Sequence, residues 1–233
     1  MDKSDLLPSL RENTVEQCIE IVKTAYPIVS PVAGSIISFL LGALPKTRER
    51  RISRFVENIF EKLQQDELII EKIEQRISSN QEQLEHIVEK VVSTAKPDKI
   101  EIFASIFINE LKGFDLNEET KEYILNIIDS RLTTLHIRIL SLMNNPKDYI
   151  ELNNIGTGIN SATFSQVFSF AFPEVNIEVI KSAYIDLFDQ GFIKTGMNMF
   201  VTMTSNRGIR LLENSVTEFG KILINYCMIK KDA

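Results

Sequence analysis

Residues 25–55 read AYPIVSPVAGSIISFLLGALPKTRERRISRF, and the character of the chain changes at Pro45. The 22 residues from Thr24 to Pro45 carry no charge, and a basic cluster follows them. A charge-free run of this length is nominally long enough to cross a membrane, and a basic cluster suits a cytoplasmic-side anchor on anionic lipid. The same run could also be the most buried helix of a helical bundle. The basic cluster consists of Lys46, Arg48, Arg50, Arg51 and Arg54.

The spacing of the prolines favours the buried helix. Pro31 and Pro45 bracket 13 residues, about 20 Å of helix, whereas the hydrocarbon core is about 30 Å thick. We therefore expect a helix over 32–44 that is buried in the resting protein, with insertion into a membrane after a trigger as the alternative. Gly34, Ser38 and Gly42 recur every four residues and place small groups on one face. Such a face allows close helix packing, so it is a candidate for self-association or membrane contact.

The composition is typical of a globular protein. Of 233 residues, 44% are hydrophobic and 25% are charged, which excludes a disordered chain and a polytopic membrane protein. Nine glycines, seven prolines and no tryptophan favour long helices over sheet. Residues 1–130 carry 16 basic and 23 acidic residues, a net charge of −7, and residues 131–233 carry 10 and 9, a net of +1. Neither half has the basic charge of a nucleic-acid-binding domain.

The cysteines and the first residues predict a cytoplasmic location. Cys18 and Cys227 lie far apart and lack metal-ligand spacing, so we expect two buried thiols in a reducing compartment. Residues 1–13, MDKSDLLPSLREN, contain no apolar signal-peptide region. With the apolar segment 27–45, the expectation is a cytoplasmic protein that is peripheral to the inner membrane or inserts into it after a trigger.

Apolar residues at three- and four-residue steps predict helices over most of the first 145 positions. Pro97 and Asp98 are expected to start one helix, and Gly113 to end it. The run 115–146 reads as one long helix or as two with a break near Leu132. The sequence thus predicts a mainly α protein with a helical bundle over residues 1–130. The other predicted helical runs are 12–25, 46–64 and 66–96, the last with a polar break at 78–83.

The pattern changes after Pro146 and predicts a second domain, residues 131–233, which begins with the helix 131–145. A β-prone run lies near Tyr149, and two helices follow at about 161–172 and 176–191, the second closed by Gly191. FIKTG (192–196) and MFVTMTS (199–205) predict a small β-hairpin before a last helix. This order resembles a winged helix-turn-helix domain.

The wing of such a domain would offer Lys194, Arg207 and Arg210 to DNA. The recognition helix, at about 176–190, carries three acidic residues and one lysine, Lys181. Phosphate contacts need Lys or Arg, so a protein-docking role is favoured over DNA binding. The acidic residues are Glu178, Asp186 and Asp189.

The sequence offers no catalytic, metal or cofactor site. Gly156-x-Gly158-x-x-Ser161 is similar to a dinucleotide-binding loop, but the third glycine and a second parallel strand are missing, so a turn with Asn160 or Ser161 as helix N-cap is favoured. The two histidines, His86 and His136, lie in separate helical runs, and His136 is expected at the edge of a core. An enzyme would need a pocket that gathers His136 with distant carboxylates.

PVAGSIISFLLGALPKTRERRISRFVENIFEKL (31–63), DKIEIFASIFINEL (98–111), SRLTTLHIRILSLMNNP (130–146) and SVTEFGKILINYC (215–227) together resemble uncharacterised bacterial proteins of the domain-of-unknown-function type. The resemblance implies a bacterial origin, a helical body, a winged-helix-like end and a role in defence against phage. It implies no catalytic residue.

The leading hypothesis is a non-enzymatic interaction protein, a component of an anti-phage or abortive-infection system. It would act through self-association, a protein partner or the membrane, with the apolar helix 32–44 and the basic helix 46–63 as its surface. The alternative is a DNA-binding winged-helix transcriptional regulator that uses residues 160–210.

Overall fold

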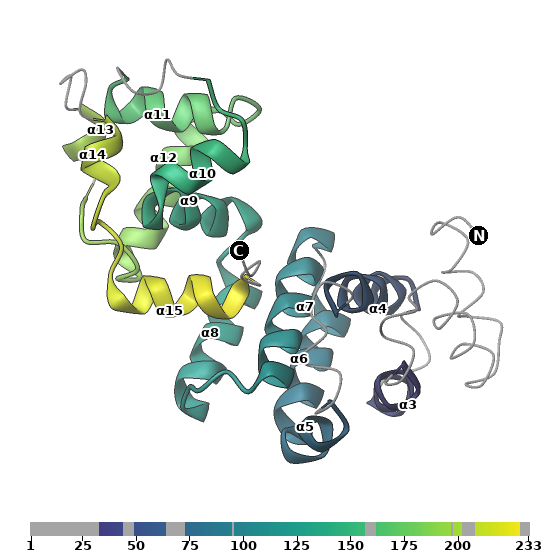
Figure 1. Cartoon of the computed structure of the whole chain (residues 1–233). Coiled ribbons are helices and arrows are strands. Elements are labelled where there is room, and N and C mark those ends of the chain that lie inside the picture. Colours follow the sequence, from purple (N-terminus) through teal and green to yellow (C-terminus); the bar gives the residue numbers. More distant parts are fainter. Residues whose placement is uncertain are drawn as a thin grey trace. The chain divides into compact units, whose positions relative to one another are not determined.

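The computed structural model describes residues 33–43, 49–63, 73–94, 96–156, 162–196, 198–201 and 208–228, and it divides them into two compact units. Unit 1 comprises the described residues up to Arg131 together with Tyr226–Met228, and unit 2 is Leu132–Asn225. The sequence analysis placed the boundary between residues 130 and 131 and gave the last residues to the second domain. The described part of the chain is mainly helical, as predicted (Figure 1).

The described residues of unit 1 begin with the apolar helix α3 (Ala33–Ala43), which directs three of its large side chains into the core. Ile36, Ile37 and Leu40 are buried, and the ring of Phe39 lies 6.1 Å from that of Phe107. The prediction of a buried apolar helix is therefore confirmed for the described residues. No helix in the described part of the chain is both long and apolar enough to cross a membrane.

The amphipathic helix α4 (Glu49–Leu63) also directs its apolar stripe into unit 1. It packs against α7 (Pro97–Lys112), and the ring of Phe55 meets that of Phe107 edge to face at 5.5 Å. Because this stripe is buried in the core, the described apolar side chains of α4 are not available for contacts with other molecules. The buried residues of the stripe are Phe55, Val56, Ile59, Phe60 and Leu63.

Helix α7 is central to unit 1, and all residues from Ile102 to Leu111 are buried. It packs against α4, α5 (Ile73–Ser79) and α6 (Gln81–Ser93), as Figure 1 shows. Its ends follow the prediction: Pro97 occupies the first turn, and Gly113 ends the helix in the left-handed conformation with φ +76°. Helix α6 ends at Ser93 and α7 begins at Pro97, as the break at Lys96-Pro97 predicted.

Helix α8 (Glu118–Ser130) completes unit 1 and is capped at both ends. The Asn117 side chain accepts a hydrogen bond from the backbone N–H of Thr120. At the other end, the ammonium of Lys99 donates to the carbonyls of Ile128 and Asp129 at 2.6 and 2.5 Å. Lys99 is 3% exposed, and burial lowers its pKa, with a further lowering from Lys96. It ties the start of α7 to the end of α8.

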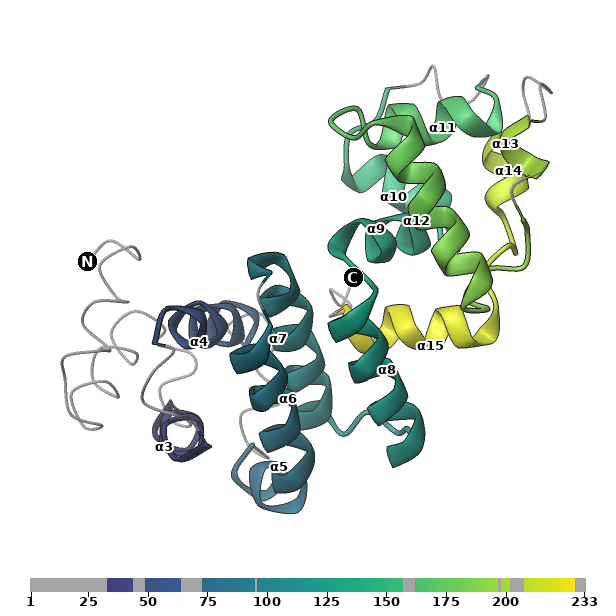
Figure 2. The same cartoon turned by 180° about the vertical axis from the view of Figure 1, so that it is seen from behind.

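Unit 2 is built from short helices around an aromatic core. Its helix α9 (Thr134–Asn144) packs against α10 (Pro146–Leu152) and α12 (Ile177–Asp189), and α11 (Phe164–Ala171) packs against α12 (Figure 2). The chain breaks at Arg131–Thr133 between α8 and α9, so the second of the two predicted alternatives is confirmed. The aromatic core consists of Phe164, Phe168, Phe172, Tyr184 and Phe200.

The predicted strand near Tyr149 is wrong. Residues 146–152 form α10, because the Asn145 side chain caps the helix by accepting from the N–H of Asp148 and Pro146 occupies its first turn. The expected N-cap at Asn160 or Ser161 lies outside the described residues, and α11 is capped instead by Thr163, which forms a reciprocal capping box with Gln166.

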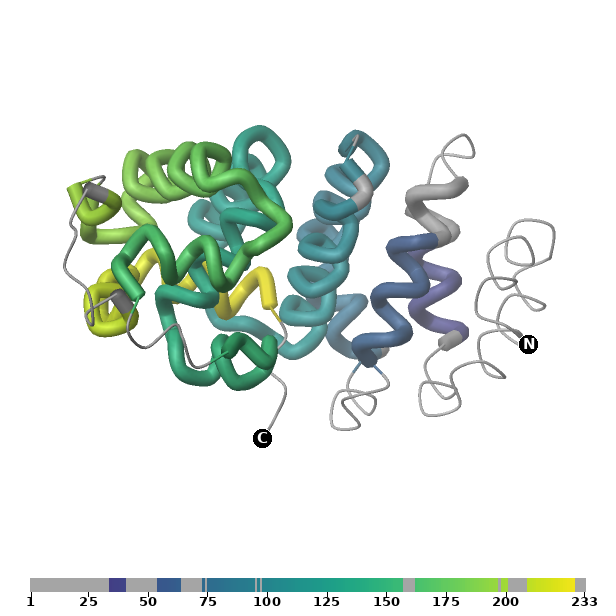
Figure 3. The backbone as a smooth tube through the Cα atoms, turned by 90° about the horizontal axis from the view of Figure 1, so that it is seen from above, coloured from purple at the N-terminus to yellow at the C-terminus, as the bar shows by residue number. Residues whose placement is uncertain are grey.

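The predicted hairpin and wing are not formed in the described residues. Asn198–Val201 is helix α13 and Gly208–Leu212 is helix α14, and both pack against neighbouring helices of unit 2. The strand-like pairing is reduced to one antiparallel bridge between Ile193 and Val216, before α15 (Glu218–Cys227). The structure therefore does not support a winged-helix domain. Figure 3 traces the chain from α3 in purple to α15 in yellow.

Candidate functional site

The small-residue face of α3 is turned away from the core of unit 1. Ser38 is exposed and Gly34 is half-buried, whereas Ile36, Ile37 and Leu40 are buried. Gly42 lies in the same helix, but its burial is not described. The bundle thus packs Ile36, Ile37 and Leu40 in its interior and leaves Ser38 exposed. The role of this face in self-association or membrane contact stays a prediction.

The basic cluster begins outside the described residues, with Lys46 and Arg48, and continues into α4 with Arg50 and Arg51. Its last member, Arg54, is exposed. Of the residues expected on the wing, Lys194 and Arg210 are exposed and Arg207 lies outside the described residues. The described residues around Lys194 and Arg210 form no wing, so the structure does not support the DNA contact for which these two residues were selected.

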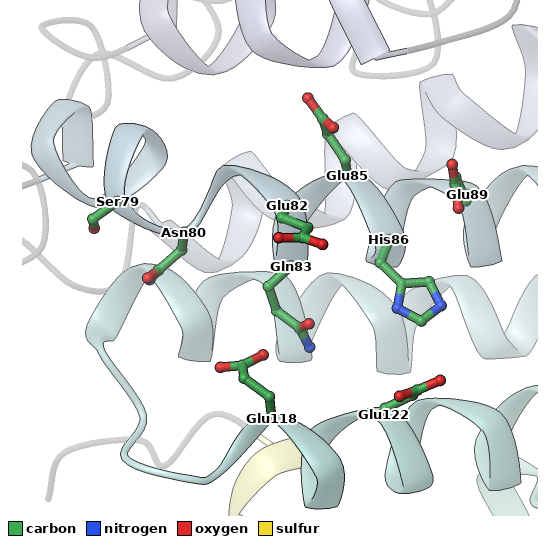
Figure 4. Close-up of a pocket in the computed structure, with 9 residues that line it drawn as sticks. All are labelled: Ser79, Asn80, Glu82, Gln83, Glu85, His86, Glu89, Glu118 and Glu122. Atoms are coloured by element: carbon green, nitrogen blue, oxygen red, sulfur yellow. The ribbon is translucent and has the colours of Figure 1, made fainter.

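A polar groove runs along α6 and α8 of unit 1, with a volume of about 610 Å³ (Figure 4). The α6 side projects carboxylates at three- and four-residue steps, so one face of that helix lines the groove. The α8 side adds Glu118 and Glu122, one turn apart. The lining residues are Ser79, Asn80, Glu82, Gln83, Glu85, His86, Glu89, Glu118 and Glu122.

The groove carries five glutamates, and none of its nine lining residues is Lys or Arg. Four of the five glutamates are exposed, and Glu85 accepts a 2.8 Å hydrogen bond from the side chain of Gln81. Close carboxylates lining one concave surface focus a negative potential and attract cations. The chemistry of the groove therefore suits a ligand rich in positive charge.

A buried ion-pair network connects α8 to α7 and includes Glu118, one of the residues that line the groove. Lys121 is 7% exposed, and its ammonium donates to Glu110 at 3.0 Å and to Glu118 at 3.1 Å. Burial alone would lower the pKa of Lys121, but the hydrogen bonds and charges of the two glutamates raise it above its usual value. Lys121 and Glu110 carry opposite formal charges that cancel, and Glu118 is already one of the five groove glutamates, so the network leaves the formal charge of the groove unchanged.

The same network holds the end of α15. The hydroxyl of Tyr226 donates a 2.6 Å hydrogen bond to Glu110, which is 1% exposed. Burial and the neighbouring charge of Glu110 raise the pKa of Tyr226, so its hydroxyl stays protonated and donates. The Asn109 amide donates to the carbonyls of Tyr226 and Met228, at 2.9 and 3.2 Å. Glu110 thus has two buried donors, from α8 and from α15.

His136 lies in the core of unit 2 with 5% of its surface exposed, as predicted. Its Nδ1 accepts from the backbone N–H of Thr133 at 3.0 Å and contacts the Thr133 hydroxyl at 2.9 Å, so the ring helps to cap α9. Because Nδ1 is an acceptor, Nε2 carries the proton and faces the Asp186 carboxylate at 3.4 Å. His136 thus contacts the carboxylate of Asp186, 50 positions away in the sequence, but its ring caps the start of α9. His86 is half-buried on the groove.

The described residues contain no group of three or more His, Cys, Asp or Glu side chains that could hold a metal ion. Cys227 is a buried free thiol, and burial raises its pKa. Cys18 lies outside the described residues. The prediction of a buried thiol is confirmed for Cys227.

The sequence analysis missed the groove because it treated the carboxylates as solvated helix faces. A signal was nonetheless present: Glu82, Glu85 and Glu89 share one face of a helix, and Glu118 and Glu122 share a face of another. What the sequence could not show is that α6 and α8 turn those two faces toward one groove. The network of Glu110, Lys121 and Tyr226 joins residues that are far apart in the sequence, so no local sequence pattern indicates it.

Comparison with known proteins gives no match: no family model fits the sequence, and no curated protein or solved structure is significantly similar to it.

Proposed function

We propose that this chain is a non-enzymatic interaction protein that self-associates by placing the basic segment 46–54 of one copy in the acidic groove of another. The observation that carries the proposal is the groove itself, with five glutamates and no basic side chain among its nine lining residues. The segment Lys46–Arg54 reads KTRERRISR, with five basic residues and one acidic. Opposite charge on two concentrated surfaces of one chain supports pairing between copies.

The packing of α4 leaves Arg54, the last residue of the basic segment, available for a partner. The apolar stripe of the helix is held against α7, and Arg54 is exposed. Because the groove and the basic segment are different parts of the chain, two copies can exchange them reciprocally in a two-fold dimer, or many copies can associate head-to-tail in a ring or filament. The resemblance to bacterial proteins supplies a setting, an anti-phage or abortive-infection system in which this association would be the working step.

The experiment that tests the proposal measures the mass of the protein in solution by sedimentation equilibrium at about 50 mM and about 500 mM salt. We expect masses above the 26.6 kDa of one chain at low salt, falling toward it at high salt, because exposed charge pairs are screened. The triple variant Glu82→Gln/Glu85→Gln/Glu89→Gln should be monomeric at both salt concentrations.

The control is a triple variant with the same charge change away from the groove. Glu119, Glu151 and Glu213 are exposed and do not line the groove. Their replacement by Gln should leave the low-salt mass unchanged, whereas Arg48→Gln/Arg50→Gln/Arg51→Gln should reproduce the groove variant. A wild-type chain that is monomeric at low salt, or equal losses in the two glutamate triples, would refute the proposal.

DNA binding is not favoured by the structure. The one lysine of α12, Lys181, pairs with Glu178 at 2.8 Å, and Asp186 and Asp189 are exposed on the same helix. A helix with this charge repels phosphate.

A further inference from the structure

Unit 1 is built from two separated stretches of the chain. The described residues up to Arg131 form its body, the chain then makes the 94 residues of unit 2 (Leu132–Asn225), and it returns with Tyr226. Unit 2 is therefore an insertion in unit 1, connected at both of its ends. The second connection is the last turn of α15.

The described residues of that returning stretch are Tyr226–Met228, and they are bound to α7 by polar contacts. The Asn109 amide donates to the carbonyls of Tyr226 and Met228, and the Tyr226 hydroxyl donates to Glu110. The ring of Phe114 lies 5.2 Å from that of Tyr226. Asn109 and Glu110 are 6% and 1% exposed, so their polar groups are covered while the segment is docked.

A network of buried hydrogen bonds forms in only one alignment of the two segments. A buried donor or acceptor that loses its hydrogen bond costs free energy. A shift of Tyr226 by one position would remove the Tyr226 hydroxyl from Glu110, which keeps Lys121, and would remove the two carbonyl acceptors of Tyr226 and Met228 from the Asn109 amide. The segment therefore has two favourable states: fully docked, or released with those groups in water.

We infer that Tyr226–Met228 is a latch that releases from α7 as a unit while unit 2 stays folded. Release opens the second connection of unit 2 and leaves the one at Arg131. It also uncovers Asn109 and Glu110 on α7. Local openings of this kind require less free energy than global unfolding and occur in contiguous segments.

The latch contains its own reporter, Cys227, which is 3% exposed. A covered thiol reacts with a labelling reagent only when the segment around it opens, so the labelling rate measures the population of the released state. Unit 2 offers a matched reporter position at Ala183 on α12, which is 4% exposed and differs from cysteine by one atom.

The experiment measures labelling by an aromatic disulfide reagent under native conditions in two full-length proteins. The first is Cys18→Ser, in which Cys227 is the remaining thiol. The second is Cys18→Ser/Cys227→Ala/Ala183→Cys, which reports on unit 2. We expect Cys227 to react at least about tenfold faster than the unit 2 reporter. Asn109→Ala should raise the Cys227 rate about tenfold further, the effect of losing a hydrogen bond of about 1.4 kcal/mol, and leave the unit 2 reporter unchanged.

Asn126→Ala is the control, because Asn126 is an exposed asparagine of unit 1 on α8; it should change neither rate. If Asn109→Ala does not fold, Tyr226→Phe serves in its place, and the comparison of the two reporters in otherwise unaltered chains needs neither variant. Equal labelling rates for the two reporters, or equal acceleration of both by Asn109→Ala, would show one cooperative unfolding and overturn the latch.

Discussion

The hydroxyl of Tyr226 donates to the carboxylate of Glu110 at 2.6 Å, across 116 positions of sequence. Both groups are buried, and the second oxygen of the carboxylate accepts from Lys121. One carboxylate on α7 thus receives donors from α8 and α15. Removing a single donor leaves a buried acceptor with half of its partners, so each member of this network has a measurable effect on stability.

Tyr226→Phe removes the hydroxyl and keeps the ring. Because Glu110 then lacks one donor in a site closed to water, we expect a loss of about 1–3 kcal/mol in the free energy of unfolding. The measurement is urea denaturation followed by circular dichroism. Tyr123, 47% exposed, supplies the control, since Tyr123→Phe should change stability by less than about 0.5 kcal/mol.

Lys121→Met removes the charge that compensates Glu110 and preserves most of the side-chain volume. Breaking a buried ion pair from one side should cost about 3–5 kcal/mol, because the remaining carboxylate stays buried without its countercharge. The double variant Lys121→Met/Glu110→Gln should be less destabilised than the sum of the two single variants, because the groups share one network. Lys147→Met, at an exposed lysine, is the control. Additive single effects would contradict the coupling.

Alkaline pH should destabilise the fold through Tyr226. Burial raises its pKa above the ordinary value of 10.0, so above pH 10 the unfolded chain releases this proton while the folded chain keeps it. Stability from this group is fully present below pH 10 and is lost as the pH rises, by at most about 1.4 kcal/mol per pH unit. Tyr226→Phe lacks the group, so its stability should fall less steeply above pH 10. Parallel pH profiles of the two proteins would refute this assignment.

Gly220→Ala should destabilise unit 2. A Cβ at this position would overlap the backbone carbonyl oxygen of Phe192 and lie 2.7 Å from Cγ1 of Val216, where α15 packs against the bridge segment. Backbone cannot move aside as a flexible side chain can, so a loss of about 1–3 kcal/mol or more is expected. Gly156→Ala, where a Cβ meets nothing within 4 Å, should be nearly neutral. Thermal unfolding of the two variants provides the comparison.

Sequence periodicity and capping residues predicted the helices of unit 1 well, because each depends on neighbours within a few positions. Pro97 and Gly113 set the ends of α7, and the polar break at Asn80 separates α5 from α6. The prediction of a strand near Tyr149 was wrong, because the capping contact of Asn145 favours a helix more than the weak strand preference of these residues opposes it. The residues 199–201 likewise joined a helix that packs in unit 2.

The candidate site was only partly foreseeable. The glutamates of α6 and α8 can be assigned to helix faces from their spacing, but the groove depends on how those helices pack. On α3, spacing identifies Gly34 and Ser38 as one face, whereas burial follows the larger apolar area of Ile36, Ile37 and Leu40. The role of the small-residue face in self-association or membrane contact stays a prediction.

The insertion of unit 2 has a consequence for folding during synthesis. Glu110 and Lys121 leave the ribosome well before their partner Tyr226, because the 94 residues Leu132–Asn225 are made in between. At about 5–20 residues per second, this interval lasts roughly 5–20 s. During it the nascent chain displays a carboxylate that still awaits its second donor, and unit 2 can fold first.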